Sequence, residues 1–251
     1  MPGDDLRWLD RRSMLRDERL VIRQFETETD RAVAVVVDAS ASMAFRGPSA
    51  PDSKLAFASL IAAALGRVAL GGGDPVGLSF IGADGHARGV DKSAGREQFD
   101  RIVASLDAVT PRGDAYGDPA MLERALGTLA RTCRRGDVVV LLSDLLDESD
   151  GDAQRVAALA SRGCVLSVVQ VLDPAEVELP YRGTVRFRAL EGTAEVEIDA
   201  DRGRREYRAR LGEISDRWKL EVTRRGGRFQ IAQTSDDPVQ VVRTIVQRLR
   251  R

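Results

Sequence analysis

Residues Ala32–Met43 have the sequence AVAVVVDASASM, and the architecture can be inferred outward from them. A run of alanine and valine leads without a break into Asp38, and two serines follow at Ser40 and Ser42. Such an apolar run without alternation is typical of a parallel strand covered by helices on both faces. Ligands of such sheets bind just beyond the carboxyl ends of the strands. The segment therefore predicts a central strand that ends at a candidate binding edge.

Apolar segments and amphipathic segments alternate along the following part of the chain. Three further strands are expected, at Val76–Ile81, Val138–Leu142 and Val165–Leu172, with a short one near Ala87–Val90. Helices are expected between them, over Lys54–Leu70, around Phe99–Leu106, from Asp118-Pro119 onward and over Asp152–Ser161. This alternation predicts a doubly wound, mostly parallel α/β sheet of the Rossmann type, with helices on both faces.

The alternation of strand and helix patterns ends after Asp173-Pro174, which indicates an addition to the α/β core. A β-hairpin is expected from Thr184–Ala189 and Ala194–Ile198, followed by a long helix, a last strand and a closing helix. The predicted organisation is a charged lead-in, residues 1–31, that packs on one domain, residues 32–251, whose C-terminal extension begins at about residue 174.

Composition narrows the class of protein. The chain has 251 residues, 43% of them hydrophobic, which is enough for a sizeable core. Lys and Arg number 38 against 39 Asp and Glu, and this balance does not favour nucleic acid or anionic membrane as a partner. Cys133 and Cys164 lie far apart, so we expect them in the core. No apolar run approaches the roughly 20 residues of a membrane span, and a chain that is complete would be cytoplasmic.

Oxygen-bearing side chains follow two of the predicted strands. Asp38, Ser40 and Ser42 occupy alternate positions and project to one side of a near-extended segment. Asp144 follows the strand Val138–Leu142, which would lie beside the first strand across the switch point. Such oxygen donors suit Mg²⁺, with Mn²⁺ or Ca²⁺ as alternatives. The competing interpretation is a plain turn and helix entry, which the same residue types also favour.

The catalytic patterns are weak. The single histidine, His86, has no serine in a G-x-S-x-G context to activate, so a Ser-His-Asp hydrolase has no support. The second interpretation of the function is a Mg²⁺-dependent phosphoryl-transfer enzyme of the haloacid dehalogenase type, with Asp38 as its nucleophile. Such an enzyme needs an acid two residues after the nucleophile, where this chain has Ser40. We therefore expect a protein that is not an enzyme.

The segment Asp38–Ser42 resembles the D-x-S-x-S loop of von Willebrand factor type A domains, which forms a metal-ion-dependent adhesion site. The resemblance implies that Asp38, Ser40 and Ser42 are metal ligands and that Asp144 reaches the ion through water. The family's threonine position falls on Ala120. Asp114 or Asp118 could substitute, although Asp118 also suits a helix cap, and a metal-free scaffold is a third interpretation.

Further motifs resemble the domain of unknown function 58 (DUF58) family. The resemblance covers nearly the whole chain, and its motifs are the GDDLRWLDRRS lead-in, Ser143–Asp147, Leu172–Glu176, Leu190–Gly192 and Arg204–Tyr207. It implies a bacterial protein that works with MoxR-type AAA+ ATPases. Members would act as adaptors in assembling, activating or remodelling other proteins.

Overall fold

The computed structural model describes residues 31–83, 89–113, 120–146, 151–188 and 195–249. Residues Arg31–Arg251 form one compact unit. The predicted lead-in lies outside the described residues except for Arg31, and so do His86, Asp114 and Asp118.

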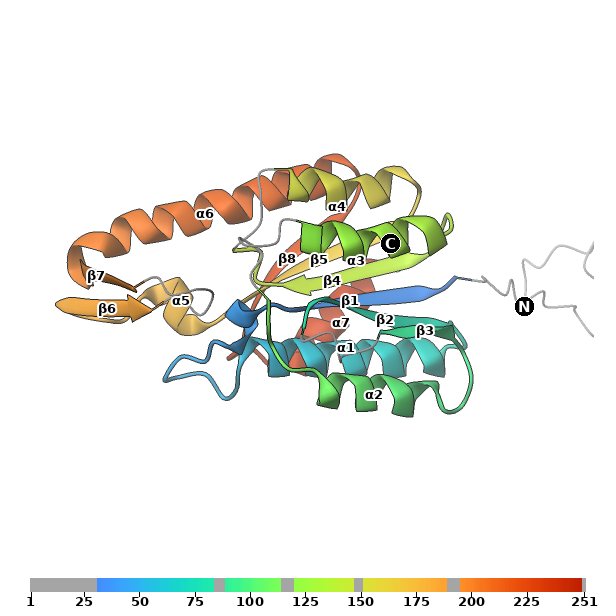
Figure 1. The fold of residues 1–251 in the computed structure, drawn as a ribbon. Coiled ribbons are helices and arrows are strands. Elements are labelled where there is room, and N and C mark those ends of the chain that lie inside the picture. Colours follow the sequence, from blue (N-terminus) through green and yellow to red (C-terminus); the bar gives the residue numbers. More distant parts are fainter. Residues whose placement is uncertain (1–30, 84–88, 114–119, 147–150, 189–194, 250–251) are drawn as a thin grey trace, which may run out of the picture. The chain divides into compact units, whose positions relative to one another are not determined.

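The central sheet has the strand order β3-β2-β1-β4-β5-β8 in the described residues (Figure 1). Its strands are β1 (Val33–Ala39), β2 (Val76–Gly82), β3 (Val90–Ser93), β4 (Val138–Ser143), β5 (Val165–Leu172) and β8 (Arg228–Gln233). All neighbouring strands pair in parallel except β3, which is antiparallel to β2. The doubly wound, mostly parallel α/β fold is thus confirmed, although β3 begins later than the sequence predicts.

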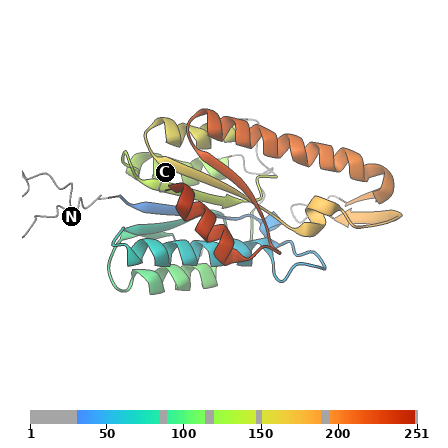
Figure 2. The same ribbon diagram turned by 180° about the vertical axis from the view of Figure 1, so that it is seen from behind.

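Helices cover both faces of the sheet (Figures 1 and 2). One face carries α1 (Lys54–Gly71), α2 (Gln98–Ala108) and α7 (Pro238–Leu249), and the other carries α3 (Ala120–Thr132), α4 (Asp152–Ser161) and α6 (Ala200–Arg224). Alternate residues of β1 enter the two cores, Val35 and Val37 on the α1 side and Ala34 and Val36 on the α3 side. Every residue of β1 is therefore buried, which explains the unbroken apolar run.

Helix α1 supports the edge of the sheet where the site lies. Ser53 caps it by accepting a hydrogen bond from the amide of Ala56 at 3.2 Å. The helix is less buried than its composition predicts, because Leu60 and Val68 are about half exposed. By length and hydropathy alone α1 could also cross a membrane, although the sequence analysis expects no membrane span. Half of the helix is buried in the fold, and core helices of other proteins also reach this length and hydropathy.

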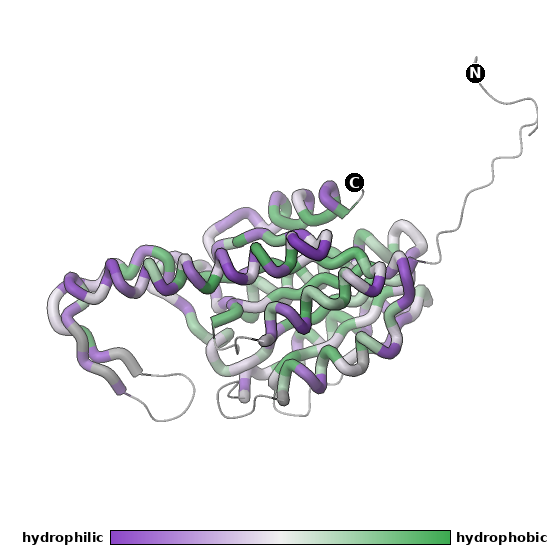
Figure 3. The backbone as a smooth tube through the Cα atoms, turned by 90° about the horizontal axis from the view of Figure 1, so that it is seen from above, coloured by the Kyte–Doolittle hydropathy of each residue, from purple (hydrophilic) through white to green (hydrophobic). Residues whose placement is uncertain are grey.

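The segment after β5 forms an extension that projects past the carboxyl edge of the sheet (Figure 1). We call it the arm: α5 (Pro174–Glu178), the hairpin of β6 (Thr184–Arg188) and β7 (Glu195–Asp199), and residues 200–211 of α6. Figure 3 shows that the arm is mostly hydrophilic. The other half of α6 is anchored in the core by the fully buried Trp218. The arm is thus an outward continuation of a well-packed helix.

Both cysteines are free thiols; Cys164 is buried and Cys133 is half-buried. Burial raises the pKa of each thiol above its ordinary value. They pack beside the α3 core, in agreement with the core position that the sequence predicts.

Candidate functional site

The two predicted acidic ligands lie at the ends of adjacent strands. Strand β1 pairs in parallel with β4, so their carboxyl ends meet at one edge of the sheet. Asp38 is the penultimate residue of β1, and Asp144 directly follows β4. Both side chains are buried, with exposed fractions of 5% and 2%. The structure therefore brings this pair together at the switch point, as the sequence predicts.

Asp38 accepts hydrogen bonds from neutral donors. Its Oδ1 accepts from the amide of Ser40 at 2.8 Å, and its Oδ2 accepts from the Ser143 hydroxyl at 2.5 Å. Burial, followed by the charge of Asp144, raises the pKa of Asp38 from 3.8 to about 6, although these hydrogen bonds oppose the shift. The carboxylate is therefore costly to keep ionised in this place unless a cation joins it.

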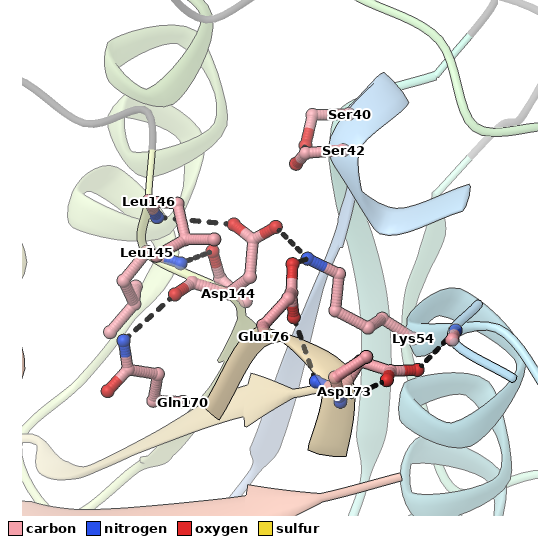
Figure 4. A network of polar contacts seen from close by, with 12 residues as sticks. Ser40, Ser42, Lys54, Asp144, Leu145, Leu146, Gln170, Asp173 and Glu176 are labelled. Atoms are coloured by element: carbon pink, nitrogen blue, oxygen red, sulfur yellow. Dashed lines mark hydrogen bonds and ion pairs between the residues drawn. The ribbon is translucent and has the colours of Figure 1, made fainter. Parts of the chain in front are cut away.

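The two serine hydroxyls lie next to each other. Ser40 precedes the short 3-10 helix Ala41–Ala44, which turns the chain so that Ser40 Oγ and Ser42 Oγ are 3.1 Å apart. Figure 4 shows them across from the carboxylate of Asp144. Adjacent oxygens around Mg²⁺ also stand about 3 Å apart, given metal–oxygen bonds of about 2.1 Å in an octahedron. The spacing is thus compatible with two neighbouring ligands of one ion.

A lysine that the sequence reasoning did not single out lies at the centre of the site. The Nζ atom of Lys54 donates to Asp144 Oδ2 at 2.7 Å and to Glu176 Oε1 at 2.6 Å, and its side chain is 0% exposed (Figure 4). Burial lowers the pKa of Lys54, but the charges of Asp144 and Glu176 outweigh burial and hold the pKa above its ordinary value. Lys54 is therefore a resident cation.

Glu176 reaches Lys54 because a capping box orients helix α5. The Asp173 carboxylate accepts from the amide of Ala175 at 2.8 Å, and Glu176 Oε2 accepts from the amide of Asp173 at 2.8 Å. The second Asp173 oxygen accepts from the amide of Gly47 at 2.8 Å. Burial raises the pKa of Glu176 in spite of the opposing charge of Lys54. Helix α5 is thereby fastened to the loop after β1 as well as to α1.

A buried polar chain supports Asp144 from behind. Leu145 adopts the left-handed conformation, with φ of 60°, which turns the chain sharply after Asp144. Gln170 of β5 donates from Nε2 to the carbonyl of Asp144 at 3.0 Å and accepts from the Ser215 hydroxyl of α6 at 2.7 Å. Asp144 is thus held by contacts from α1, β5 and, through Gln170, α6.

The variant Gln170→Leu should lower the free energy of unfolding by about 1–3 kcal/mol, because it leaves buried polar partners without their hydrogen bonds. Denaturant titration measures this change. The control is Gln240→Leu on the exposed face of α7, where little change is expected. Equal stability of Gln170→Leu and the native chain would show that this chain of hydrogen bonds does not hold Asp144.

The site has an excess of negative charge that a divalent cation could balance. Asp144 and Glu176 share the ammonium of Lys54, and Asp38 lies close enough to Asp144 for their charges to interact. When all four groups are ionised, the cluster therefore carries two negative charges in excess. Within the described residues, no three His, Cys, Asp or Glu side chains form a metal-binding group by themselves. The donor set that fits a hard cation is Asp38, Ser40 and Ser42 with Asp144. Ala120, to which the resemblance assigns the position of a threonine ligand, is the first residue of α3.

Ser40 stands two residues after Asp38, where a phosphoryl-transfer enzyme would need an acid. Its hydroxyl lies next to that of Ser42. The site therefore offers oxygen ligands without the acid–base pair of the haloacid dehalogenase mechanism.

The sheet order and the D-x-S-x-S loop at its switch point define an α/β protein with a von Willebrand factor A-like fold. The family model described as "Protein of unknown function DUF58" matches residues 1–216, so the chain belongs to the DUF58 family.

An uncharacterized protein of Mycobacterium tuberculosis is 31% identical over 211 residues, which are 83% of this chain and 64% of that protein. The chain thus spans less than two thirds of the length of that relative. Among solved structures, BatB from Bacteroides thetaiotaomicron aligns with a TM-score of 0.52 and 19% identity, over 87% of this chain and 98% of that one. A von Willebrand factor type A protein from Catenulispora acidiphila aligns with a TM-score of 0.45 and 11% identity, over 87% of this chain and 42% of that one.

The sequence reasoning missed Lys54, Glu176 and Gln170. Glu176 had a readable signal, because Asp173-Pro174-Ala175-Glu176 has the form of a capping box with proline at the first helical position. Lys54 had a weaker one, as a lysine at the start of an otherwise apolar helix. Gln170 lies in an apolar strand, and only the structure shows its partners.

Proposed function

We propose that the chain is a non-enzymatic, protein-binding adaptor of the cytoplasm that works with a MoxR-type AAA+ ATPase in assembling or remodelling other proteins. The observation that supports it most directly is the convergence of Asp38 and Asp144 with the paired hydroxyls of Ser40 and Ser42. The Mg²⁺ would be held by these four side chains. Bound there, it would supply a Lewis-acidic position that can accept a carboxylate of the partner.

The residues of the chain have separate parts in this proposal. Asp38 supplies a buried negative charge that no nearby ammonium neutralises in the contacts described above. Ser40 and Ser42 supply neutral oxygens, which leave an ion with positive charge for an outside ligand. Asp144 and Gln170 fix the far side of the site. The partner's acidic group is therefore the expected counterpart of the site.

The variant Asp38→Ala should abolish capture of the ATPase partner and leave the fold intact. The tagged protein and a MoxR-type ATPase would be mixed with Mg²⁺ or with chelator, and the retained ATPase measured. Circular dichroism and the thermal midpoint report the fold. We expect retention with Mg²⁺ and loss of retention with chelator or in Asp38→Ala.

A matched control is Asp236→Ala, at an exposed carboxylate of the turn after β8. It should capture the ATPase as the native chain does. Capture that survives both chelator and Asp38→Ala would overturn metal-mediated docking. It would favour a metal-free scaffold, for which the internal Lys54 ammonium is the structural support.

A further inference from the structure

The contacts of Lys54 join the candidate site to the arm. Its ammonium is shared between Asp144, which belongs to the site, and Glu176, which belongs to α5. Both ion pairs are short, and the Lys54 side chain is fully buried. A charge placed so close to a ligand, and away from water, acts strongly on any ion bound beside it.

We infer that Lys54 and Glu176 set the affinity of the D-x-S-x-S site for a divalent cation, in opposite directions. This inference rests on the proposed function, in which the site binds an ion, and it adds what controls the affinity for that ion. Lys54 opposes the ion because its positive charge sits on Asp144. Glu176 favours the ion because it draws the ammonium toward α5 and adds a negative charge to the cluster.

The net charge of the buried cluster gives the order of affinities. Asp38, Asp144, Glu176 and Lys54 together carry −2 when all are ionised. Glu176→Gln leaves −1, Lys54→Met leaves −3, and the double variant returns to −2. The affinity for a divalent cation should follow this sequence, since the attraction grows with the charge of the cluster.

Glu176 also makes the arm part of this balance. Arg208 of α6 donates from Nε to the Val177 carbonyl at 3.1 Å, and Arg204 donates from Nε to the Leu179 carbonyl at 3.0 Å. These arginines hold the end of α5 to the arm's long helix. A partner that displaces the arm would move Glu176 and thereby change the affinity for the ion. Because binding free energies are reciprocal, the ion would change the affinity for that partner equally.

The test is a Mn²⁺ titration of the native chain and its variants, followed by electron paramagnetic resonance of free Mn²⁺. We expect Glu176→Gln to weaken binding and Lys54→Met to strengthen it, each by about tenfold or more, because each changes the cluster by a full charge. Lys92→Met is the matched control, since Lys92 pairs with Asp137 at the opposite edge of the sheet, at 2.8 Å. Its affinity for Mn²⁺ should stay at the native value.

The opposite signs separate this inference from a purely structural role. If Lys54 and Glu176 only held the scaffold together, both variants would weaken binding, and the double variant would be the weakest. We expect instead that Lys54→Met/Glu176→Gln binds Mn²⁺ as the native chain does. If Lys54→Met does not fold, the affinity of the double variant for Mn²⁺ is compared with that of Glu176→Gln instead. Removing two opposite charges together destabilises a fold less than removing one of them.

Failure of the inference can be distinguished from failure of the proposed function. Binding that weakens in both single variants, or changes in neither, overturns the inference and leaves metal-dependent capture to stand on its own test. Binding that appears only in Lys54→Met supports the inference and removes the ion from the function of the native chain. Absence of Mn²⁺ binding in every variant overturns the inference.

Discussion

The variant Lys54→Met is expected to lower the free energy of unfolding by about 3–5 kcal/mol when divalent ions are absent, the usual cost of removing one partner from a buried ion pair. The methionine would fill most of the space, so the loss would be electrostatic. Asp144 and Glu176 would remain close together, buried and without the ammonium that they share. Denaturant titration in chelator measures the effect.

The effect should depend on burial, and two comparisons test this. Lys92→Met removes an ion pair whose lysine is 23% exposed, although its partner Asp137 is only 4% exposed, so we expect a smaller loss than that of Lys54→Met. The double variant Lys54→Met/Glu176→Gln should recover part of the stability that Lys54→Met loses. A cost for Lys54→Met no greater than that for Lys92→Met would contradict the assignment of Lys54 as the buried cation that Asp144 and Glu176 share.

The placement of the site could be predicted because it depends on local patterns. The valine run of β1 needs burial on both faces, and β4 has the same character, so the two strands belong in the middle of a parallel sheet. Their carboxyl ends must then meet. The convergence of Asp38 and Asp144 follows from this geometry, without any knowledge of the side-chain contacts.

Lys54 could not be predicted in the same way, because its role depends on two partners far along the chain. Asp144 is 90 residues away and Glu176 is 122 residues away. A lysine at a helix start is normally interpreted as a solvated residue, since lysine is seldom fully buried without a partner. Only the packing of α1 against the ends of β4 and β5 removes it from water.

The arginines of α6 show the same limit. The sequence predicts solvated faces for Arg202–Arg210, and Arg202 is indeed exposed. Arg204 is different, because its guanidinium donates to carbonyls of Leu179 and Tyr181 in the connection between α5 and β6. Charge and periodicity alone cannot distinguish a free arginine from one that binds backbone carbonyls of a neighbouring segment.

The variant Asp38→Asn is expected to stabilise the fold at neutral pH in chelator, by about 3 kcal/mol at most, which is the free energy that corresponds to raising the pKa of Asp38 from 3.8 to about 6 by burial and by the charge of Asp144. The folded-state pKa of Asp38 lies at about 6, above its ordinary value of 3.8. Between these values the folded chain binds more protons than the unfolded chain. The contribution of Asp38 to stability is therefore present at low pH and is lost as the pH rises through 6.

The measurement compares Asp38→Asn with the native chain by denaturant titration at pH 5 and pH 8. The difference should favour Asp38→Asn at both pH values, and it should be about half as large at pH 5, which lies between the two pKa values of Asp38, as at pH 8. Adding Mn²⁺ at pH 8 should stabilise the native chain and leave Asp38→Asn unchanged, because the amide lacks the charge that attracts the ion. An Asp38→Asn variant that is less stable than the native chain at pH 8 in chelator would show that the carboxylate is already neutralised.

Stabilisation by Asp38→Asn would explain what the buried aspartate costs the fold, and would raise the question of why it is kept. A buried charge that destabilises the empty fold is a net disadvantage unless it acts on something else. At Asp38 the cost is concentrated at the open end of a parallel strand, beside two hydroxyls and a second carboxylate. If stability is gained by Asp38→Asn and capture of the partner is lost by it, the two effects together identify Asp38 as a residue retained for binding.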